Sequence, residues 1–337
     1  FQADDGIRDP LWSRGLGDVY KRQVLAGPLL AQQAETAGVV YSLAWGDQPA
    51  LICEHVDWAR SCGFEVTAAG KGTRYLPEYH SLTPDTVWNV LREYLDIEDP
   101  NSINLQMFNS FLDGSKSAIE MTAVCNATGL VPQAAGLTFP PSSRFSLADV
   151  CKPEQDGGAL TRSGTTEVVS SLKRSGESVD HHLAMGTFVV VKPGTDYARQ
   201  CFREYHMLPD ESGLYGALYR PTHMIGLELG LSVASVALRG EPTGRPYCFS
   251  SDVVAVAKRD LNAGERLDGE GGHCVYGQQM PASLSIAKDA LPLGLSGGVT
   301  LSRDVSAGQV LCEADTALDN SDDAVKARRM MISGFAS

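Results

Sequence analysis

The C-terminal part of the chain contains an internal repeat. Residues 258–267 align with residues 302–311 at an offset of 44, and the Arg, Asp, Ala, Gly and second Leu positions match between the two copies. In each copy an apolar stretch precedes the Arg-Asp pair. The Ala-Gly pair can then turn the chain into another strand, because glycine tolerates positive φ. Two such units predict a small β module over residues 251–318, and we expect the polar residues 319–337 to form a flexible tail.

A different pattern precedes this module. Two helical stretches, each followed by a short apolar stretch typical of a strand, fill residues 28–69, and Pro28 suits the first turn of the first helix. Helices that alternate with strands over about 45 residues predict parallel α/β structure. We therefore expect residues 24–70 to be the end of a Rossmann-type, doubly wound domain, and residues 71–250 to form an α+β domain. Its expected elements are helices at 86–94, 113–128 and 224–238 and strands at 165–172 and 187–191.

The first 23 residues lack a period that fits either a helix or a strand. Glycine and proline recur, charges of both signs are irregular, and a clear helical pattern begins only at Val24. The block from Ile7 to Gln23 resembles translated sequencing-adapter sequence. We interpret residues 1–23 as a non-native leader, with an ordinary flexible leader as the alternative. On the first interpretation the native sequence is truncated upstream of Val24.

Charge and cysteine content exclude several classes of protein. The formal net charge of −13 argues against a nucleic-acid partner or an anionic membrane partner, both of which favour a basic face. The sequence contains no apolar run of the ~18–20 residues that a membrane span needs. The eight cysteines are scattered without a C-x-x-C pair, so we expect reduced thiols in a cytoplasmic protein and no metal site.

A glycine-rich stretch follows the second expected strand. Gly70, Gly72 and Thr73 surround Lys71, and the aromatic residue Tyr75 comes soon afterwards. Ligands of open α/β sheets bind beyond the carboxyl ends of the strands, where glycines let backbone N–H groups approach an anion. This pattern predicts an anion-binding loop with Lys71 as its positive charge. The alternative is a solvated lysine in an ordinary turn.

A second group of polar residues lies at the start of an expected helix. Asp113, Lys116 and Glu120 fall on adjoining turns, where a lysine can polarise a carbonyl group or move a proton. The structural alternative is equally good: Asp113 would cap the helix, and Lys116 with Glu120 would form an ordinary ion pair.

Histidines supply weaker signals. We expect His223, which follows Arg220, to lie in the first turn of a helix, where the positive end of the helix dipole favours its neutral form. It is a candidate acid, base or substrate ligand, although a structural role is more common for a single histidine. The pair at residues 181–182 and the stretch at residues 53–55 are weak candidates for metal ligands.

Four segments carry a resemblance to a known family. Residues 46–50, 69–80, 111–121 and 219–230, in this order, resemble homoserine dehydrogenase-like oxidoreductases with a C-terminal SAF module. This group includes the deoxyxylulose-phosphate reductoisomerase-like proteins. The repeat described above is similar to SAF modules, which have a compact β-clip arrangement.

The resemblance implies a Rossmann domain that binds NADPH or NADH, a catalytic α+β domain and a β-clip module. It implies that Lys116 assists proton transfer, that Asp113 orients it, and that Lys71 holds the substrate by a phosphate or carboxylate group. The glycine-rich dinucleotide loop of the family is expected upstream of Val24. The other residues marked by the resemblance are Gly70, Thr73, Tyr75, Glu120, Arg220 and His223 for the substrate, and Gly46, Asp47 and Gln48 for the cofactor.

These expectations lead to one main function and two alternatives. We expect an NAD(P)-dependent oxidoreductase, of which an oxidoisomerase would be one form, that acts on a polyhydroxylated or phosphorylated small molecule. The first alternative is a non-catalytic sugar-acid or carbohydrate-binding protein that uses the SAF module. The second is a chain without activity, because the cofactor loop is missing from it. We also expect the protein to be a homo-oligomer.

Overall fold

The computed structural model describes residues 11–96, 99 and 103–335. The chain divides into two compact units, each assembled from separate stretches of sequence. As far as these residues are described, the first unit consists of Phe1–Leu29, Pro77–Ile119 and Asp252–Ser337, and the second consists of Leu30–Leu76 and Glu120–Ser251. Within the described part of the chain, no helix is both long and apolar enough to cross a membrane.

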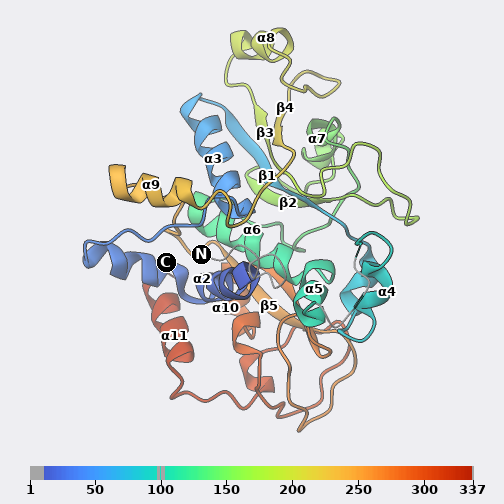
Figure 1. The fold of residues 1–337 in the computed structure, drawn as a ribbon, viewed down its shortest axis with the longest axis vertical. Helices are drawn as coiled ribbons and strands as arrows, with labels where there is room; N and C mark the ends of the chain where they lie inside the picture. Colours follow the sequence, from blue (N-terminus) through green and yellow to red (C-terminus); the bar gives the residue numbers. More distant parts are fainter. Residues whose placement is uncertain (1–10, 97–98, 100–102, 336–337) are drawn as a thin grey trace. The chain divides into compact units, whose positions relative to one another are not determined.

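The second unit is built on a mixed four-stranded sheet (Figure 1). Strand β1 pairs with β2 in parallel, whereas β1 with β3 and β3 with β4 are antiparallel, which gives the order β2-β1-β3-β4. Its elements are α3 (Gln48–Ser61), β1 (Glu65–Thr73), α6 (Ser115–Thr128, whose second half belongs here), α7 (Leu147–Val150), η3 (Glu154–Asp156), β2 (Thr165–Ser170), β3 (Thr187–Lys192), α8 (Asp196–Glu204), β4 (Gly216–Arg220) and α9 (Gly230–Arg239).

Apolar side chains cover both faces of this sheet. On one face Ile52 and Val56 of α3 and Met121 of α6 pack with Val168 and Val189 of the strands. On the other face a second buried cluster brings Leu147 and Ala148 of α7 together with Phe188 and Val190 of β3. The sheet is therefore buried on both sides, and polar groups on the α3 side lie in an otherwise apolar layer.

The parallel arrangement that we expected for residues 24–70 is not formed. These residues supply one strand, β1, which lies between a parallel and an antiparallel neighbour. Residues 39–45 form no strand; this segment is held by loop contacts such as the hydrogen bond from Leu43 N to Gly244 O (2.8 Å). A short apolar run does not distinguish a paired strand from an extended connection, because pairing depends on distant residues.

Three other elements differ from the expectation. Helix α9 begins at Gly230, so His223 precedes it and does not lie in its first turn. The sequence analysis predicts neither strand β4 nor helix α8. Helix α8 buries only Phe202, so its sequence lacks a clear apolar face. In α9 the buried residues are Ser232 and Ser235. The apolar side chains of α9 are largely exposed. The expected homo-oligomer stays a prediction.

The first unit contains the internal repeat, whose two copies pair with each other. Leu261 and Val305 exchange both backbone hydrogen bonds, at 2.8 and 2.9 Å. Asp260 Oδ1 accepts from Ala307 N, and Asp304 Oδ1 accepts from Ala263 N, each at 2.8 Å. Each aspartate thus caps the Ala-Gly turn of the other copy, which explains why both residue pairs recur. The glycines of both turns have positive φ, as predicted.

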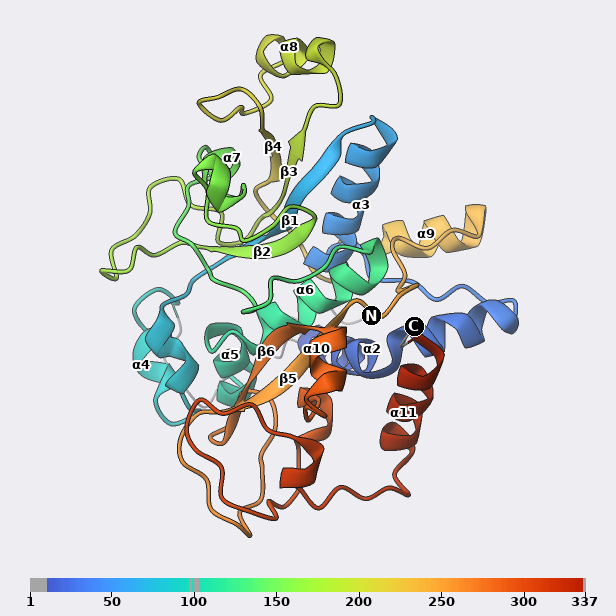
Figure 2. The ribbon, with the colours of Figure 1, turned by 180° about the vertical axis from the view of Figure 1, so that it is seen from behind.

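Two short strands, β5 and β6, form the antiparallel sheet of this unit (Figure 2). The elements are α2 (Leu11–Thr36, whose first part belongs here), η1 (Pro77–Ser81), α4 (Val87–Leu91), α5 (Leu105–Leu112), β5 (Ser251–Ala257), β6 (Val275–Pro281), α10 (Ala282–Ala287), η4 (Leu293–Leu295), η5 (Glu313–Asp315) and α11 (Asp323–Phe335).

Both ends of the described chain are more helical than the sequence suggested. Helix α2 begins at Leu11, so Pro28 lies inside the helix and not in its first turn. Helix α11 occupies much of the segment that we expected to be flexible, and its Arg328 is buried in an ion pair with Asp252 of β5. This ion pair ties the helix to the β module.

Candidate functional site

Three polar residues line up across the sheet of the second unit. Lys71 of β1 lies opposite Thr187 of β3, and Thr187 lies opposite Arg220 of β4. Side chains of directly opposite residues in an antiparallel pair point to the same face. That face is the one covered by α3 and α6, because Val189 lies two residues from Thr187 and packs with them. We call Lys71, Thr187 and Arg220 the cross-strand row.

The charge of Lys71 is compensated inside the protein. Its ammonium group forms an ion pair with the carboxylate of Glu120 on α6, and both side chains are almost fully buried. A buried ion pair costs desolvation free energy, and removal of one partner leaves the other charge uncompensated. Lys71 and Glu120 were assigned to the substrate by resemblance, and the structure brings them into direct contact.

The expected anion-binding loop around Lys71 is not formed. Residues 70–73 lie inside β1 rather than beyond it. A Cβ atom on Gly70 would lie 1.7 Å from Glu167 O, and one on Gly72 would lie 1.9 Å from Leu183 O. These glycines therefore permit close approach of neighbouring backbone and do not cradle a ligand. Thr73 ends the strand, where its carbonyl accepts a hydrogen bond from Ser171 N (2.8 Å).

Tyr75 has a structural position. Its ring stacks on that of Phe139 with centroids 3.8 Å apart, and both residues belong to the buried cluster on the α3 side. The structure thus places Tyr75 in the core, and its assignment to the substrate stays a prediction.

Helix α3 contributes a buried histidine to the cross-strand row. His55 Nε2 lies 3.0 Å from Thr187 Oγ1. Burial, with a smaller effect from the positive charge of Arg220, lowers the pKa of His55 to about 4, so the ring is neutral near pH 7. The sequence marked this histidine only as a weak metal candidate and did not mark Thr187. The structure brings His55 and Thr187 together by strand pairing and packing. Thr187 is more than a hundred residues away in sequence from both Lys71 and His55, so a local sequence pattern does not show these contacts.

Arg220 also has a carboxylate partner. It forms an ion pair with Glu228 in the segment before α9. His223 lies between these two residues in sequence. Its Nδ1 lies 2.8 Å from the carbonyl oxygen of Met185, which keeps the ring close to the start of β3. The structure thus places Arg220 in the row and His223 in a loop beside it.

The three residues expected to bind the cofactor have internal partners. Asp47 caps α3 by accepting a hydrogen bond from Gln48 N (2.9 Å), and Gln48 Nε2 donates to Gly186 O (3.3 Å). A Cβ atom on Gly46 would lie 2.7 Å from Met224 O, so the glycine permits a close approach of the neighbouring backbone. These contacts do not fit a dinucleotide-binding loop, because the polar groups already hold α3 against the strand that carries Thr187.

The first unit holds a second polar cluster, around Asp113. Asp113 Oδ1 accepts from Ser115 N (2.9 Å), which confirms the structural alternative of a helix cap. Its other oxygen pairs with Lys258 Nζ at 2.8 Å, and the same ammonium group donates to Leu82 O and Gly272 O at 2.6 and 2.8 Å. His80 Nδ1 lies 2.6 Å from Asp113 O. Lys258 and Asp113 are both buried.

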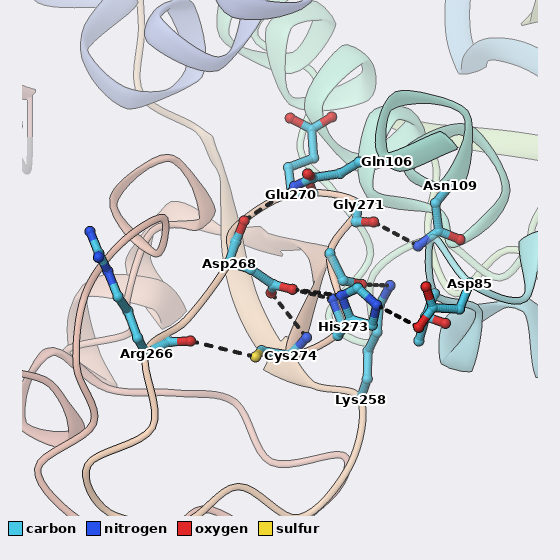
Figure 3. A network of polar contacts seen from close by, with 12 residues as sticks. Asp85, Gln106, Asn109, Lys258, Arg266, Asp268, Glu270, Gly271, His273 and Cys274 are labelled. Atoms are coloured by element: carbon cyan, nitrogen blue, oxygen red, sulfur yellow. Dashed lines mark hydrogen bonds and ion pairs between the residues drawn. The ribbon is translucent and has the colours of Figure 1, made fainter. Parts of the chain in front are cut away.

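Neighbouring contacts extend this cluster, as Figure 3 shows. Asn109 Nδ2 donates to Gly271 O (2.8 Å), and His273 lies between the carboxylates of Asp85 and Asp268, 3.1 Å from each. Lys116 stands over the ring of Phe111, 4.8 Å from its centroid. The proposed orientation of Lys116 by Asp113 stays a prediction.

In the described parts of the chain, no three His, Cys, Asp or Glu side chains are grouped so that they could hold a metal ion. The histidine pair has other contacts: the ring of His181 packs edge-on against Phe145, and His182 Nδ1 accepts from Ala184 N.

Comparison with known families shows which family domains contain the cross-strand row and the cluster around Asp113. Residues 46–229, more than half of the chain, match the family model described as "Oxidoreductase DRL, catalytic domain", and residues 252–317 match the SAF domain. The chain belongs to the DRL oxidoreductase family. No match was found among curated proteins. The oxidoreductase class and the SAF module predicted from the sequence are thereby confirmed.

The DRL match contains the whole cross-strand row together with His55 and Glu120. It also contains Asp113, whereas the partner Lys258 belongs to the SAF match. The SAF domain of this DRL protein is thus joined to residues 77–119 by a buried ion pair, and both belong to one compact unit.

Proposed function

We propose that this DRL protein is an NAD(P)-dependent oxidoreductase for a polyhydroxylated or phosphorylated small molecule, and that the cross-strand row handles its substrate. The observation that carries the proposal is the buried Lys71–Glu120 pair, in line with Thr187 and Arg220 near the carboxyl ends of β1 and β4. Buried charged groups add little to the stability of a core, because their desolvation offsets their attraction. Their presence in one row of a protein that belongs to an oxidoreductase family therefore supports a functional role.

Oxidation of an alcohol to a carbonyl group releases a hydride and a proton. NAD or NADP would take the hydride, and no residue of this chain is assigned to it, since Gly46, Asp47 and Gln48 do not fit. In the reverse direction, reduction of the carbonyl group, the Lys71 ammonium group would donate the proton to the substrate oxygen as the hydride is transferred. Glu120 would keep the ammonium group in position and balance its charge. Lys116 and Asp113 retain the roles implied by the resemblance to homoserine dehydrogenases, as predictions.

The test uses two buried lysines that differ in location. Lys152 is also buried and paired with a carboxylate, Asp210 at 2.8 Å, but it lies outside the row and serves as the matched control. Wild type, Lys71→Met and Lys152→Met are assayed by NAD(P)H absorbance against sugar phosphates, sugar acids and polyols. Loss of general acid–base catalysis costs about 10²–10⁴-fold in kcat, so Lys71→Met should lose at least about a hundredfold.

Lys152→Met should lose stability but keep its turnover. Turnover by folded Lys71→Met at the wild-type rate would refute the assignment, as would an equal loss in both variants. A wild-type chain that turns over none of these compounds and does not bind NAD(P)H would refute the function itself.

The sugar-acid-binding alternative remains a prediction. The buried contacts of the SAF domain with residues 77–119 give it no specific support, because they favour an integrated role for that domain. Calorimetry of the full chain with sugar acids separates the two: saturable binding unchanged in Lys71→Met would favour the alternative.

A further inference from the structure

The substrate proposed above carries an anionic group in one of its forms, and the compensated Lys71 is poorly suited to hold it. The loop before α7 offers a different cation. Arg144 is half-buried, and its guanidinium carbon lies 5.0 Å from the ring centroid of Phe145 and 5.9 Å from that of Tyr219. Its Nε atom is shielded from solvent and has no hydrogen-bond partner among the described residues.

Hydrogen bonds between serines give this loop a defined shape. Ser143 Oγ accepts from Phe145 N and Ser146 N at 3.2 and 3.1 Å, and Ser146 Oγ accepts from Ser143 N at 3.1 Å. Arg144 N donates to His181 O at 2.9 Å, which anchors the loop to the segment before β3. The backbone that carries Arg144 is therefore held in place without any contact to its guanidinium group.

Arg144 differs in its electrostatics from three other cations of the second unit. Lys71, Lys152 and Arg220 each have a carboxylate within ion-pair distance. For Arg144 the described residues provide no such carboxylate, only the two aromatic faces. A guanidinium group stays charged at all physiological pH values, so a partly buried one without a counter-ion favours binding of an anion.

The surroundings of Arg144 are open to a ligand. Phe145 and Met185, which flank the loop and β3, expose 48% and 59% of their surface. Tyr219 precedes Arg220 of the cross-strand row in β4. A bound anion would thus have a cation, apolar contacts and access from solvent at the same edge of the sheet at which β4 ends.

We propose that Arg144 binds an oxyanion, the carboxylate or phosphate group of the substrate, through the fork formed by its two terminal nitrogens, because its Nε atom is shielded from solvent. Planar bidentate pairing of this kind is the geometry in which a guanidinium group recognises carboxylates and phosphates. The rings of Phe145 and Tyr219 hold the guanidinium plane in place. The identity of the ligand as a substrate rests on the function proposed above, whereas the anion site does not.

The experiment measures binding of inorganic phosphate and of acetate to the full chain by calorimetry, at constant ionic strength with chloride as the background anion. The matched control is Arg174→Met, because Arg174 is exposed on a nearby loop and donates to Thr138 O. Arg144→Met should weaken binding of the preferred anion by about tenfold or more, since it removes hydrogen bonds to a charged group. Arg144→Lys, which keeps the charge but not the fork, should fall in between.

Phosphate and acetate distinguish the two ligand classes, and the preferred one is the anion that binds more tightly to wild type. Absence of saturable binding to wild type would overturn the proposal, as would wild-type affinity in folded Arg144→Met or an equal loss in Arg174→Met. Lys71→Met should keep its anion affinity. A loss of anion binding confined to Arg144 variants in a chain without turnover would leave the anion site standing and refute only the oxidoreductase function.

Discussion

Acidification should destabilise this protein through His55. The residue is 7% exposed on α3, and its Nε2 contacts Thr187 Oγ1. Burial, together with the charge of Arg220, lowers its pKa from 6.5 to about 4 in the folded protein. The unfolded chain therefore binds a proton at a higher pH than the folded chain does. Stability contributed by the neutral ring is present above about pH 6.5 and is lost as the pH falls towards 4.

The size of this effect follows from the two pKa values. The gap between 6.5 and about 4 corresponds to about 3 kcal/mol once both states are protonated. At about pH 5 the unfolded chain is mostly protonated at this site and the folded chain is not, which removes about 2 kcal/mol from the free energy of unfolding.

Urea unfolding at about pH 7.5 and about pH 5 measures this loss. Carboxylates also titrate in this interval, so the decisive quantity is the difference between wild type and His55→Gln, which can still contact Thr187 but does not titrate. Wild type should lose about 2 kcal/mol more than the variant. His206→Gln, at an exposed histidine, should behave like wild type. An equal loss in wild type and His55→Gln would refute the assignment of a buried neutral ring.

Two further predictions concern buried charges. Lys258→Met leaves the Asp113 carboxylate buried without its cation, so urea unfolding should show a free energy of unfolding lower by about 3–5 kcal/mol. Adding Asp113→Asn should recover most of this loss, and a loss below about 1 kcal/mol would contradict the ion pair. Burial raises the pKa of Glu167, so the free energy of unfolding of wild type should fall relative to that of Glu167→Gln as the pH rises past about 4.5. Urea unfolding between about pH 4 and 7 measures this difference, and a difference that stays constant over that range would contradict the prediction.

Local patterns of the sequence predicted the features that depend on neighbouring residues. The helical pattern within residues 28–69 predicted helix α3, because such a pattern depends on residues three and four positions apart. The repeat likewise predicted the β module, since both of its turns need an Ala-Gly pair. It did not reveal that Asp260 and Asp304 cap the opposite turns, because each contact spans more than forty residues.

The errors in the candidate site have a common origin. Gly70 and Gly72 suggested a ligand loop, and only the neighbouring strands show that the glycines make room for backbone. Glycine tolerates both situations, so its presence in the sequence does not distinguish them. In the same way Tyr75 was grouped with polar neighbours, although its ring is part of the core.

The sequence by itself determined the oxidoreductase class, the SAF module and helix α3, and it marked Lys71, Glu120 and Arg220 as candidate site residues. Only the tertiary structure decided that Lys71 and Arg220 share a row with Thr187 and that Glu120 compensates Lys71. It also decided that the Nε atom of Arg144 has no hydrogen-bond partner among the residues that the structure describes. The physical reason is that strand register and charge compensation are pairwise properties of residues far apart in the chain. A sequence read along its length shows which charges exist, and folding determines which of them remain for a ligand.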